Sequence, residues 1–584
     1  MQTIEIVHEL LELADILEIA GANGHRVRAF RNGARSLESW QGDLAGLVEA
    51  GEVTSIRGIG SSLAAIIEEA VTGGSSAEAA EIRASVPAEL LEWLRIPGVG
   101  PKKVRAIWEG LGITRIAELE AALRQEQVRG LKGFGPKSEA DILAGIERMK
   151  KFAGRSLTHV AEEVAARFLL AVESAPGVQR AAIAGSLRRR RETIGDVDIL
   201  VAAEDGEPAR AAFLGSPGIE SVAAEGRKKC RVVSSEGIGV DLRIVAPIEF
   251  PAALHYFTGS KEHNTRLRQL AKDRGWKLNE YGLWRVADGD AEDERIETAD
   301  EDAIFRALDL APVPPELRED LGEVEQGAET ESFPTLVEVG DLRGILHNHS
   351  TWSDGRNSLR EMVEAARSKG WEYYGTADHS RTASYAGGLS IAELREQRAE
   401  VDALNEEFDD ITILHGIESD ILPDGSLDYP DEVLAELDYV VASVHANFSL
   451  DRETQTARIE RALRSPFTTV WGHPTGRLLL RRDPYDCDME HLLSVAAEEG
   501  VIVEINASPH RLDLDWRWGG RVRDLGVEVG IHPDAHSIAG IDDVRHGIGV
   551  ARKAGLTSEQ VTNTWPIERY LGRLRARRNR AGIS

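Results

Sequence analysis

Residues 184–200 read AGSLRRRRETIGDVDIL and combine a small turn, four consecutive arginines and two closely spaced aspartates. Asp196 and Asp198 flank Val197 at the spacing of a β-strand, where residues i and i+2 point to the same face. The two carboxylates therefore project together, and a cation between them would relieve their repulsion. Because sites with oxygen ligands only favour Mg²⁺ or Mn²⁺, the pair predicts a divalent metal site.

The first half of this stretch is suited to binding phosphate. Gly185 and Ser186 form a small turn, so backbone N–H groups can approach an anion, and the arginines add positive charge beside it. A lone Asp-x-Asp is as often only a solvated strand face, but the combination in one short span is hard to obtain by chance. Carboxylates for metal beside a cradle for phosphate indicate nucleotidyl transfer.

The stretch resembles the nucleotidyltransferase motif of X-family DNA polymerases, GSxRRxxExxGDxDxL, and matches it at every fixed position. The resemblance implies that Asp196 and Asp198 are ligands of two catalytic Mg²⁺ or Mn²⁺ ions. It also implies that Gly185, Ser186 and Arg189 contact a dNTP, with the serine and the arginine at the departing pyrophosphate.

Two later segments extend this resemblance. Asp241 lies in an expected strand at residues 240–245 and resembles the third carboxylate of the family, which takes the proton of the primer 3′-hydroxyl. Without the upstream motif, an exposed strand aspartate would remain a fair alternative reading of this position. The segment that begins with HYFTGS at residue 255 resembles the family's thumb. The resemblance implies dNTP contacts at Tyr256, Phe257, Gly259 and Asn264, and a template-side DNA contact at Arg268.

The first 150 residues contain three copies of one pattern, in which an apolar residue and a Gly-x-Gly turn precede a helical stretch. A single copy would more often be a helix C-cap, but three indicate an internal repeat. They resemble the helix-hairpin-helix motif of DNA repair proteins, whose glycines and following helix N-terminus bind a DNA phosphate without reading sequence. The residues expected to contact DNA are Gly58, Gly60, Gly98, Gly100, Lys102, Gly133, Gly135 and Lys137.

Eukaryotic X-family members remove 5′-deoxyribose phosphate with a Schiff-base lysine in the domain of the first repeat. Aligning the glycines places that lysine position on Ile66. Isoleucine cannot form an imine, so we expect no lyase activity by this route.

From Asp341 onward, apolar strand-like runs alternate with helical stretches, as in a parallel α/β domain. The great majority of these runs are followed by a residue that can bind metal. A lone histidine in such a place is usually a satisfied core or surface residue, but here the residues recur at the strand ends that carry the chemistry of α/β barrels. Histidine with carboxylate suits Mn²⁺, Zn²⁺ or Fe²⁺, and the lack of cysteine argues against a structural zinc site.

The motifs HNHSTWSDG, TADHS, IESDIL, SVHA, GHP and DAH resemble the PHP phosphoesterase family, whose fold is a distorted seven-stranded β/α barrel. The resemblance implies about three divalent metals. A residue that can bind metal stands at every ligand position that the family would lead one to expect. One metal would take His347, His349, Glu418 and Asp534; a second would share Glu418 and add His445 and His473; the third would take Asp354, His379 and His536.

Composition restricts the class of protein. The chain has 584 residues, 42% apolar and 29% charged, which predicts a soluble protein of several domains. No apolar run approaches the ~20 residues of a membrane span, and two distant cysteines fit a reducing cytoplasm. The net charge of −29 argues against DNA binding only if read globally, because phosphate contacts depend on local basic clusters. We expect a cytoplasmic monomer that binds gapped or nicked double-stranded DNA and dNTPs, and no membrane.

The expected architecture is multidomain: a helical helix-hairpin-helix region, an α+β palm and thumb, and a C-terminal α/β PHP barrel. The expected boundaries are 1–85 and 86–150 for two helical DNA-binding domains, 151–250 for the palm, 251–320 for the thumb, 321–340 for a linker and 341–584 for the PHP domain. The expected function is filling of short gaps in DNA repair, with metal-dependent 3′–5′ exonuclease, 3′-end-processing and AP-endonuclease activity in the PHP domain. A small-molecule phosphatase and a DNA-end-binding scaffold with vestigial sites are the alternatives.

Overall fold

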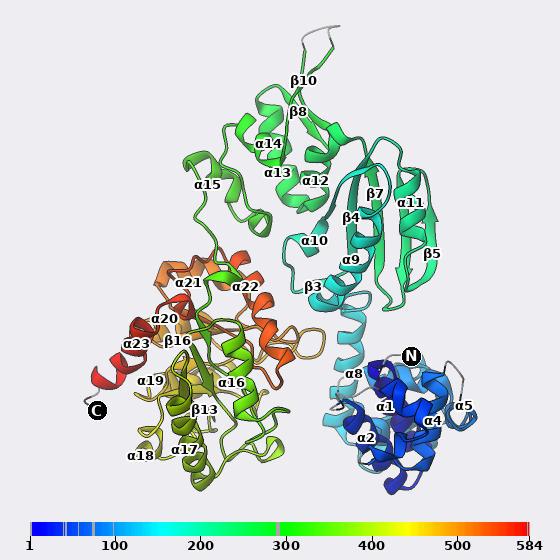
Figure 1. The fold of residues 1–584 in the computed structure, drawn as a ribbon, viewed down its shortest axis with the longest axis vertical. Coiled ribbons are helices and arrows are strands. Elements are labelled where there is room, and N and C mark those ends of the chain that lie inside the picture. The colour runs from blue at the N-terminus through cyan, green and yellow to red at the C-terminus, as the bar shows by residue number, and fades with distance from the viewer. Residues whose placement is uncertain are drawn as a thin grey trace. The chain divides into compact units, whose positions relative to one another are not determined.

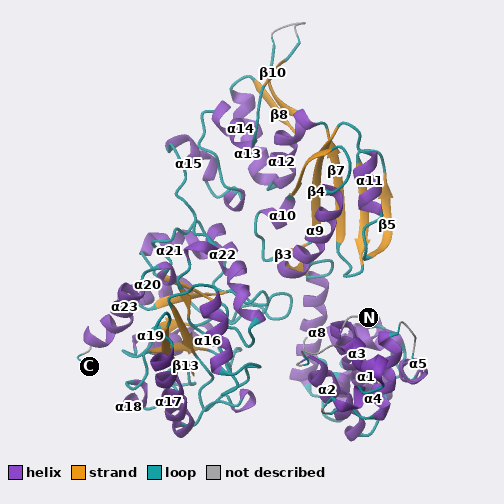
Figure 2. Ribbon diagram, in the orientation of Figure 1, coloured by secondary structure: helices purple, strands orange, loops and turns teal. Residues whose placement is uncertain are grey.

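The computed structural model describes residues 3–38, 40, 44–56, 58–72, 76–96, 98–287, 292–580 and 582. It divides into two compact units, Met1–Ala153 and Gly154–Ser584. Figure 1 follows the chain through both units, and Figure 2 shows that the first is built of helices whereas the second contains all the sheets. In the described part of the chain, no helix is long and apolar enough to cross a membrane. The predicted fold class is confirmed: a helical region, an α+β module and an α/β barrel follow one another.

The first unit packs its helices around one apolar core, which includes the fully buried Leu10, Ile67, Val104 and Ile146. The three expected hairpin helices begin directly after the second glycine of each repeat, as α4 (Ser61–Val71), α6 (Pro101–Leu111) and α8 (Pro136–Lys151). The arm before each turn is a 3₁₀ helix, namely η1 (Val53–Ser55), η2 (Ala88–Arg95) and η3 (Val128–Gly130). The other helices are α1 (Thr3–Ile19), α2 (Gly24–Glu38), α3 (Leu44–Ala50), α5 (Ala77–Ala84) and α7 (Ile116–Arg124).

The second unit opens with a five-stranded sheet in the order β2-β4-β7-β6-β5. Its strands are β2 (Val178–Ile183), β4 (Asp196–Ala203), β5 (Ile219–Glu225), β6 (Lys229–Ser234) and β7 (Gly239–Val245). The helix α9 (Thr158–Glu173) and the helix α12 (Phe250–Thr258) both pack against β4. In β4 the first three side chains alternate between half-buried and buried, and all later ones are buried. The helices that cover the sheet explain this burial. The carboxylates therefore lie at the one end of the strand that stays open.

The thumb region combines α12 with α13 (Lys261–Asp273), α14 (Glu301–Ala307) and a sheet of β8 (Trp276–Asn279), β9 (Gly282–Arg285) and β10 (Glu294–Ile296). Its core includes Leu267, Phe305 and Val324. Val324 belongs to α15 (Glu323–Glu329), which lies inside the segment expected to be a linker. The buried ring of His263 contacts the Glu323 carboxylate with 2.6 Å between Nδ1 and Oε1. The first part of that segment is thus folded onto the thumb, because its apolar and acidic side chains have partners there.

The C-terminal half forms a seven-stranded parallel sheet in which the strands follow sequence order from β11 to β17. The strands are β11 (Gly344–Ile345), β12 (Tyr373–Thr376), β13 (Thr412–Asp420), β14 (Tyr439–Ser443), β15 (Val470–Trp471), β16 (Ile502–Asn506) and β17 (Val529–His532). A parallel bridge between Asn348 and Ala535, just beyond β11 and β17, brings the two edges together. The sheet is therefore a nearly closed barrel, as expected.

The barrel interior is filled at the amino ends of its strands. Tyr373, Tyr439 and Ile502 begin their strands and pack with Tyr570 of α23 (Ile567–Arg580). The rings of Tyr373 and Tyr570 stack with centroids 4.8 Å apart. Because this apolar plug occupies the amino ends, the opposite, carboxyl ends remain for polar side chains.

The barrel packs directly against the palm within the second unit. Lys553, at the end of α22 (Val544–Lys553), is fully buried and donates hydrogen bonds to the carbonyl oxygens of Arg189 (3.0 Å) and Glu316 (3.2 Å). Its ammonium also contacts Glu319 at 2.5 Å. Arg517 of the barrel meets the buried Glu192 of the palm at 2.9 Å. Every charge here has an opposite partner, which is the condition for burying charge without a large loss of stability.

A histidine at this interface predicts a pH effect on stability. Burial, with His510 and Arg545 nearby, lowers the pKa of His159 to about 4. In the unfolded chain its pKa is about 6.5, so the unfolded state binds more protons as the pH falls below that value and folding loses stability. We expect the free energy of unfolding to fall less steeply between pH 7 and pH 5 in His159→Gln than in the wild type. The difference in slope corresponds to at most about one proton bound on unfolding. Urea midpoints of both proteins at the two pH values measure this, and an identical decline would contradict it.

Candidate active sites

Three carboxylates meet on two paired strands of the palm. Asp198 of β4 is the direct register partner of Asp241 of β7, and Asp196 lies two residues before Asp198 on the same strand. The Oδ1 atom of Asp241 is buried and has no hydrogen-bond partner among the residues that the structure describes. The Oδ2 atom contacts Arg231 at 2.5 Å, and this guanidinium also approaches Asp196 at 3.4 Å. Two strands that are distant in sequence thus deliver one acidic cluster.

The electrostatics of this cluster fit a divalent cation. Burial and the charges of Asp196 and Asp241 raise the pKa of Asp198 to about 7. A cation bound between these carboxylates would remove the repulsion that raises this pKa, and oxygen-only ligands suit Mg²⁺ or Mn²⁺. The unpartnered Oδ1 of Asp241 is one position where such an ion could bind.

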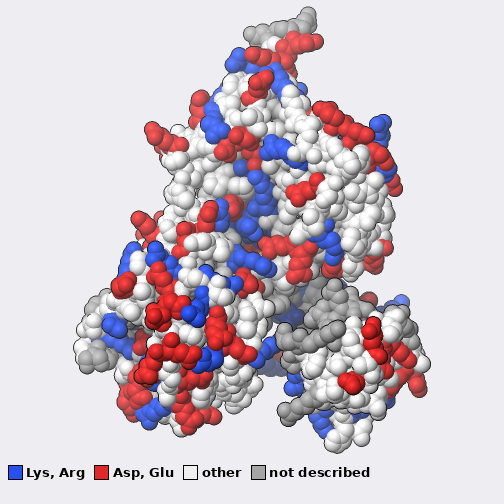
Figure 3. Space-filling view, viewed as in Figure 1, with Lys and Arg blue, Asp and Glu red and all other residues white. Residues whose placement is uncertain are grey.

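A pocket of about 320 Å³ opens beside these aspartates. Its lining contains every residue expected at the dNTP, together with Arg268, which was expected at DNA, and Lys261, which was not predicted: Gly185, Ser186, Arg189, Asp196, Asp198, Tyr256, Phe257, Gly259, Lys261, Asn264 and Arg268. Lys261 follows Gly259-Ser260 directly, so its charge beside a glycine turn was the available signal. Figure 3 shows Lys and Arg gathered over α10 (Gly185–Arg188), α12 and α13, which line this pocket.

One predicted phosphate contact is engaged elsewhere in this structure. The Nε of Arg189 donates to Glu319 at 3.0 Å, its Nη1 donates to the carbonyl oxygen of Thr258, and its side chain is 12% exposed. Glu319 is the same carboxylate that Lys553 of the barrel contacts. The guanidinium would have to leave this pair to reach a triphosphate.

Gly185 offers a direct test of the palm site. Its φ is +64°, and a Cβ atom there would lie 2.2 Å from Oδ2 of Asp198. Gly185→Ala would strain the turn and displace that carboxylate, so we expect kcat/KM for dNTP incorporation to fall about a hundredfold, since a misplacement of about 1 Å can cost that much. The control is Gly237→Ala in the turn between β6 and β7, because its φ is +77° but a Cβ there meets nothing within 4 Å. Equal activities of the two variants in a primer-extension assay would contradict the expectation.

The hairpin turns of the first unit have the conformation that requires glycine. Gly58, Gly98 and Gly133 adopt φ values of +88°, +79° and +90°. The second glycine of each pair caps a helix without any side-chain hydrogen bond, so the first N–H groups of α4, α6 and α8 face outward. Lys102, one residue into α6, is 87% exposed, and Lys137 is also exposed. Ile66 is 1% exposed in the helical core, where it packs as an apolar residue.

The second cluster lies at the carboxyl ends of the barrel strands, within β13 for Glu418 and just beyond the strand ends for the other residues. It consists of four overlapping groups of side chains that could hold metal ions. Within each group, one possible ligand atom from every residue lies within 4.8 Å of the others. The groups are His349, Asp354, His379 and His536; His347, His349 and Asp534; His347, Glu418 and His473; and His379, Glu418 and His445. All nine residues predicted to be ligands fall within these four groups. The sharing differs from the expected sets: Glu418 groups with His347 and His473 on one side and with His379 and His445 on the other.

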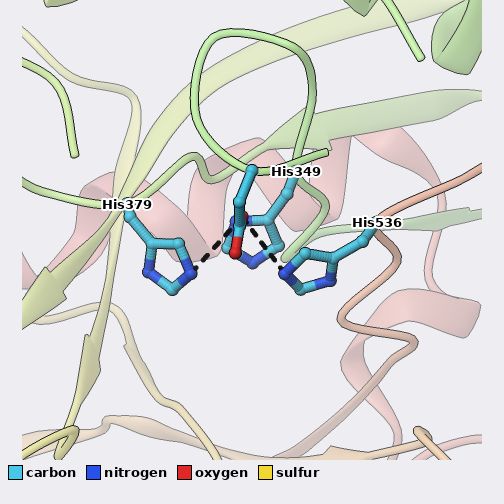
Figure 4. A group of neighbouring side chains, drawn as sticks. His349, His379 and His536 are labelled. Atoms are coloured by element: carbon cyan, nitrogen blue, oxygen red, sulfur yellow. Dashed lines mark ion pairs between the residues drawn. The ribbon is translucent and has the colours of Figure 1, made fainter. Parts of the chain in front are cut away.

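The distances show Glu418 at the centre of this cluster. Its Oε1 lies 2.9 Å from Nε2 of His473 and 3.1 Å from Nε2 of His445, and its Oε2 lies 2.9 Å from Nδ1 of His379. Burial would raise the pKa of Glu418, but the histidines, His445 and His347 foremost, hold that pKa well below its usual range. Figure 4 shows His349, His379 and His536 brought together from three separate segments, with the rings of His349 and His536 stacked at 4.1 Å.

Residues around the ligands orient them. Nδ1 of His347 lies 2.6 Å from Glu504, and Nδ1 of His445 lies 2.6 Å from Asp420. Such carboxylates fix the tautomer of a ligating histidine, leaving its other nitrogen free for metal. The sequence interpretation missed these two roles, although Asp420 stands two residues after Glu418 in the IESDIL motif and Glu504 ends an apolar strand-like run. The Nε2 atom of His347 has no hydrogen-bond partner among the described residues and lies 3.2 Å from Oε1 of Glu418, as expected for two atoms that could share a metal ion.

Comparisons with known families cover most of the chain. Residues 1–76 match a helix-hairpin-helix domain and residues 88–148 a SAM-like helix-hairpin-helix tandem. Residues 253–319 match the DNA polymerase beta thumb, and residues 346–508 match the PHP domain.

Individual proteins resemble either the whole chain or one half of it. The rat DNA polymerase lambda is 28% identical over 308 residues, which are 48% of this chain and 49% of that protein. A probable phosphatase of Thermoanaerobacter sp. (strain X514) is 28% identical over 248 residues, 39% of this chain and 95% of that protein. The DNA polymerase/3′-5′ exonuclease PolX of Bacillus subtilis (strain 168) is 38% identical over 566 residues, 96% of this chain and 97% of that protein. Because this last similarity spans nearly all of both proteins, the chain belongs to the PolX family of bacterial X-family DNA polymerases.

Proposed function

We propose that this protein is a DNA-directed DNA polymerase that fills short gaps during DNA repair, and that its PHP centre removes nucleotides or blocking groups from 3′ ends. One observation carries the proposal: a single chain presents three carboxylates on two paired strands of the palm and, separately, four overlapping groups of side chains in the barrel that could hold metal ions. The names of the B. subtilis and rat relatives support the same activities.

In the palm, we assign Asp196, Asp198 and Asp241 to two Mg²⁺ or Mn²⁺ ions, and in the barrel we assign about three ions of Mn²⁺, Zn²⁺ or Fe²⁺ to the four overlapping groups. Bound there, such ions would stabilise charge on the reacting phosphate and lower the pKa of a bound water or hydroxyl. The histidine nitrogens and carboxylate oxygens of the barrel suit the borderline metals, whereas the palm offers oxygen alone.

The palm side chains have distinct roles in the proposed reaction. The Oδ1 of Asp241, which has no hydrogen-bond partner among the described residues and lies 3.9 Å from Nζ of Lys229, would accept the proton of the primer 3′-hydroxyl, while Arg231 holds the other oxygen. The N–H groups of the Gly185-Ser186 turn and the side chain of Lys261 would bind the departing pyrophosphate. Tyr256 and Phe257, whose rings meet edge to face at 5.2 Å, would support the sugar of the incoming nucleotide.

The hairpin turns are proposed to hold the DNA substrate, a gapped or nicked duplex, by its phosphates. We expect the pair of substitutions Lys102→Ala and Lys137→Ala to weaken binding to all sequences alike and to reduce the slope of log K against log [salt] by about two, one for each lost phosphate contact. Fluorescence anisotropy of a labelled gapped duplex at several salt concentrations measures this. Glu109→Ala on the exposed end of α6 serves as the control. An unchanged slope in the double variant would show that these lysines do not face DNA.

One incubation tests both proposed activities. A duplex with a one-nucleotide gap and a labelled primer is mixed with the full chain, dNTPs and either Mg²⁺ or Mn²⁺. We expect extension by one nucleotide, and shortening of the primer when dNTPs are withheld and Mn²⁺ is present. A gel that showed neither product would overturn the proposal.

The PHP centre has a second candidate substrate. The relatives that match this half alone are described as probable phosphatases, which favours hydrolysis of phosphate monoesters such as a 3′-phosphate. Release of inorganic phosphate from a 3′-phosphorylated oligonucleotide, compared with release of nucleotide from a 3′-hydroxyl oligonucleotide, separates the two.

A further inference from the structure

An exposed aromatic ring stands beside the metal-competent histidines of the barrel. Tyr385, in the short helix η7 (Ser384–Ala386), is 73% exposed, although its ring centroid lies only 6.3 Å from that of His379. Burial of its inner edge, together with the carboxylates of Asp420 and Glu418, raises the pKa of Tyr385 to about 12. A phenol is neutral near pH 7 even at its ordinary pKa of about 10, so the ring would not repel a phosphate.

The loop that carries Tyr385 is tightly anchored. Oγ1 of Thr382 donates to Asp420 at 2.7 Å, and the N–H of Thr382 donates to Asp428 at 2.8 Å. A Cβ atom at Gly388 would lie 1.9 Å from the carbonyl oxygen of Ser380, so the two arms of the loop touch. An aromatic side chain held outward by a fixed loop loses little conformational entropy when a ligand stacks on it, because the loop is already ordered.

Two arginines, Arg482 and Arg511, lie in the loops that follow the carboxyl ends of β15 and β16. Nε of Arg511 lies 3.5 Å from Oδ2 of the ligand Asp534, and its buried Nη1 has no hydrogen-bond partner in the described residues. Arg482 lies 3.9 Å above the ring of Phe448. Its Nε donates to the carbonyl oxygen of Gly476 at 2.9 Å, three residues beyond the metal-competent His473. Two cations that each lie beside segments bearing metal-competent residues, one of them with an unused N–H donor, are suited to an anion.

We propose that Tyr385, Arg482 and Arg511 form the subsite for the 3′-terminal nucleotide of a DNA strand. The terminal base stacks on Tyr385, Arg511 faces the phosphodiester that is cut, and Arg482 faces the next phosphate along the strand. Water adds to phosphorus, the bond from phosphorus to the 3′-oxygen of the preceding nucleotide breaks, and that oxygen takes up a proton. The subsite rests on the proposed exonuclease function and gives it a substrate class, because a simple phosphate monoester has no use for a stacking ring or a second cation.

Two small substrates isolate the contribution of the base. The p-nitrophenyl ester of thymidine 5′-monophosphate presents a terminal nucleoside, whereas methyl p-nitrophenyl phosphate presents the same leaving group without one. With the full chain and Mn²⁺, we expect Tyr385→Ala to lower kcat/KM for the nucleoside ester about tenfold more than for the methyl ester, chiefly through KM, since stacking on one aromatic side chain contributes about 1–3 kcal/mol per base. Tyr385→Phe keeps the ring and should restore the preference for the nucleoside.

The arginines are distinguished by substrate length. Arg482→Gln should slow the removal of a nucleotide from a single-stranded oligonucleotide more than it slows hydrolysis of the nucleoside ester, which has no second phosphate. Arg511→Gln should slow both substrates. Arg464→Gln, at an exposed arginine of the same domain that pairs with Glu460, is the matched control.

Each outcome has one meaning. If the wild-type chain hydrolysed none of the diesters, the proposed exonuclease function would fail and the subsite with it. If the wild type were active but Tyr385→Ala changed both small substrates by the same factor, or neither, the stacking role would be overturned while the function stood. Loss of the nucleoside preference in Tyr385→Ala and its return in Tyr385→Phe is the result that supports the subsite.

Discussion

Replacing Asp198 by asparagine is expected to lower dNTP incorporation at least about a thousandfold, because the central carboxylate of the palm loses its charge with almost no change in shape. Asp198 is the one member of the acidic cluster that pairs in register with Asp241 and lies on the same strand as Asp196. A neutral amide there cannot complete a metal site between the other two carboxylates. The measurement is single-nucleotide incorporation on a gapped duplex with Mg²⁺.

The same variant should keep its 3′–5′ degradation within about twofold of the wild type, because the barrel ligands lie on other strands and do not contact Asp198. Asp205→Asn is the control for folding and purity: Asp205 is exposed in the same module, and its carboxylate only accepts a hydrogen bond from the N–H of Glu207, as an amide oxygen could. Degradation lost together with incorporation would contradict two independent sites.

The reverse result is expected for His349→Ala. His349 is fully buried, belongs to two of the four metal-competent groups and contacts Asp534 with 3.1 Å between Nε2 and Oδ1. Its loss removes a ligand from both groups, and we expect Mn²⁺-dependent degradation to fall at least about a hundredfold, with fewer bound metal ions per chain. Incorporation of dNTP should persist, and elemental analysis of the purified protein measures the metal content.

A surface histidine of the same barrel provides the control for this variant. His491 is 46% exposed and pairs with Glu460, away from the cluster, so His491→Ala should keep both its metal and its degradation activity. Thermal unfolding of His349→Ala separates a lost ligand from a lost fold, because a folded variant with less metal still unfolds cooperatively. If His349→Ala retained full degradation activity and metal, the assignment of the barrel centre would be wrong.

The sequence was most informative where a residue type recurs at a spacing that few structures other than the predicted one would require. The paired aspartates of β4 and the histidines at strand ends could be recognised because their periodicity places them on a shared face or edge. The three hairpin repeats could be recognised equally well, since glycine adopts without strain the left-handed backbone found at Gly58, Gly98 and Gly133.

Partnerships between distant segments could not be predicted in the same way. Which barrel ligands share Glu418 depends on distances between strands, and Arg189 meets Glu319 across 130 positions of sequence. The roles of Glu504 and Asp420 were hidden for a similar reason, because an acidic residue next to a motif does not reveal which histidine it will orient. Tyr385 was missed because nothing in its neighbours in sequence shows that η7 folds back to the histidines.

The buried Lys553 makes the barrel and the polymerase half depend on each other's residues during evolution. Its ammonium is satisfied by the backbone of Arg189 and Glu316 and by the carboxylate of Glu319, all of which belong to the polymerase half. If recombination exchanged this barrel for the barrel of another protein, Lys553 would be lost. The carbonyl oxygens of Arg189 and Glu316 and the carboxylate of Glu319 would then lack their hydrogen-bond donor, unless the new barrel carried a lysine at the same place. The barrel and the polymerase half look like separable domains in the sequence, but we expect the residues of this contact to be retained together.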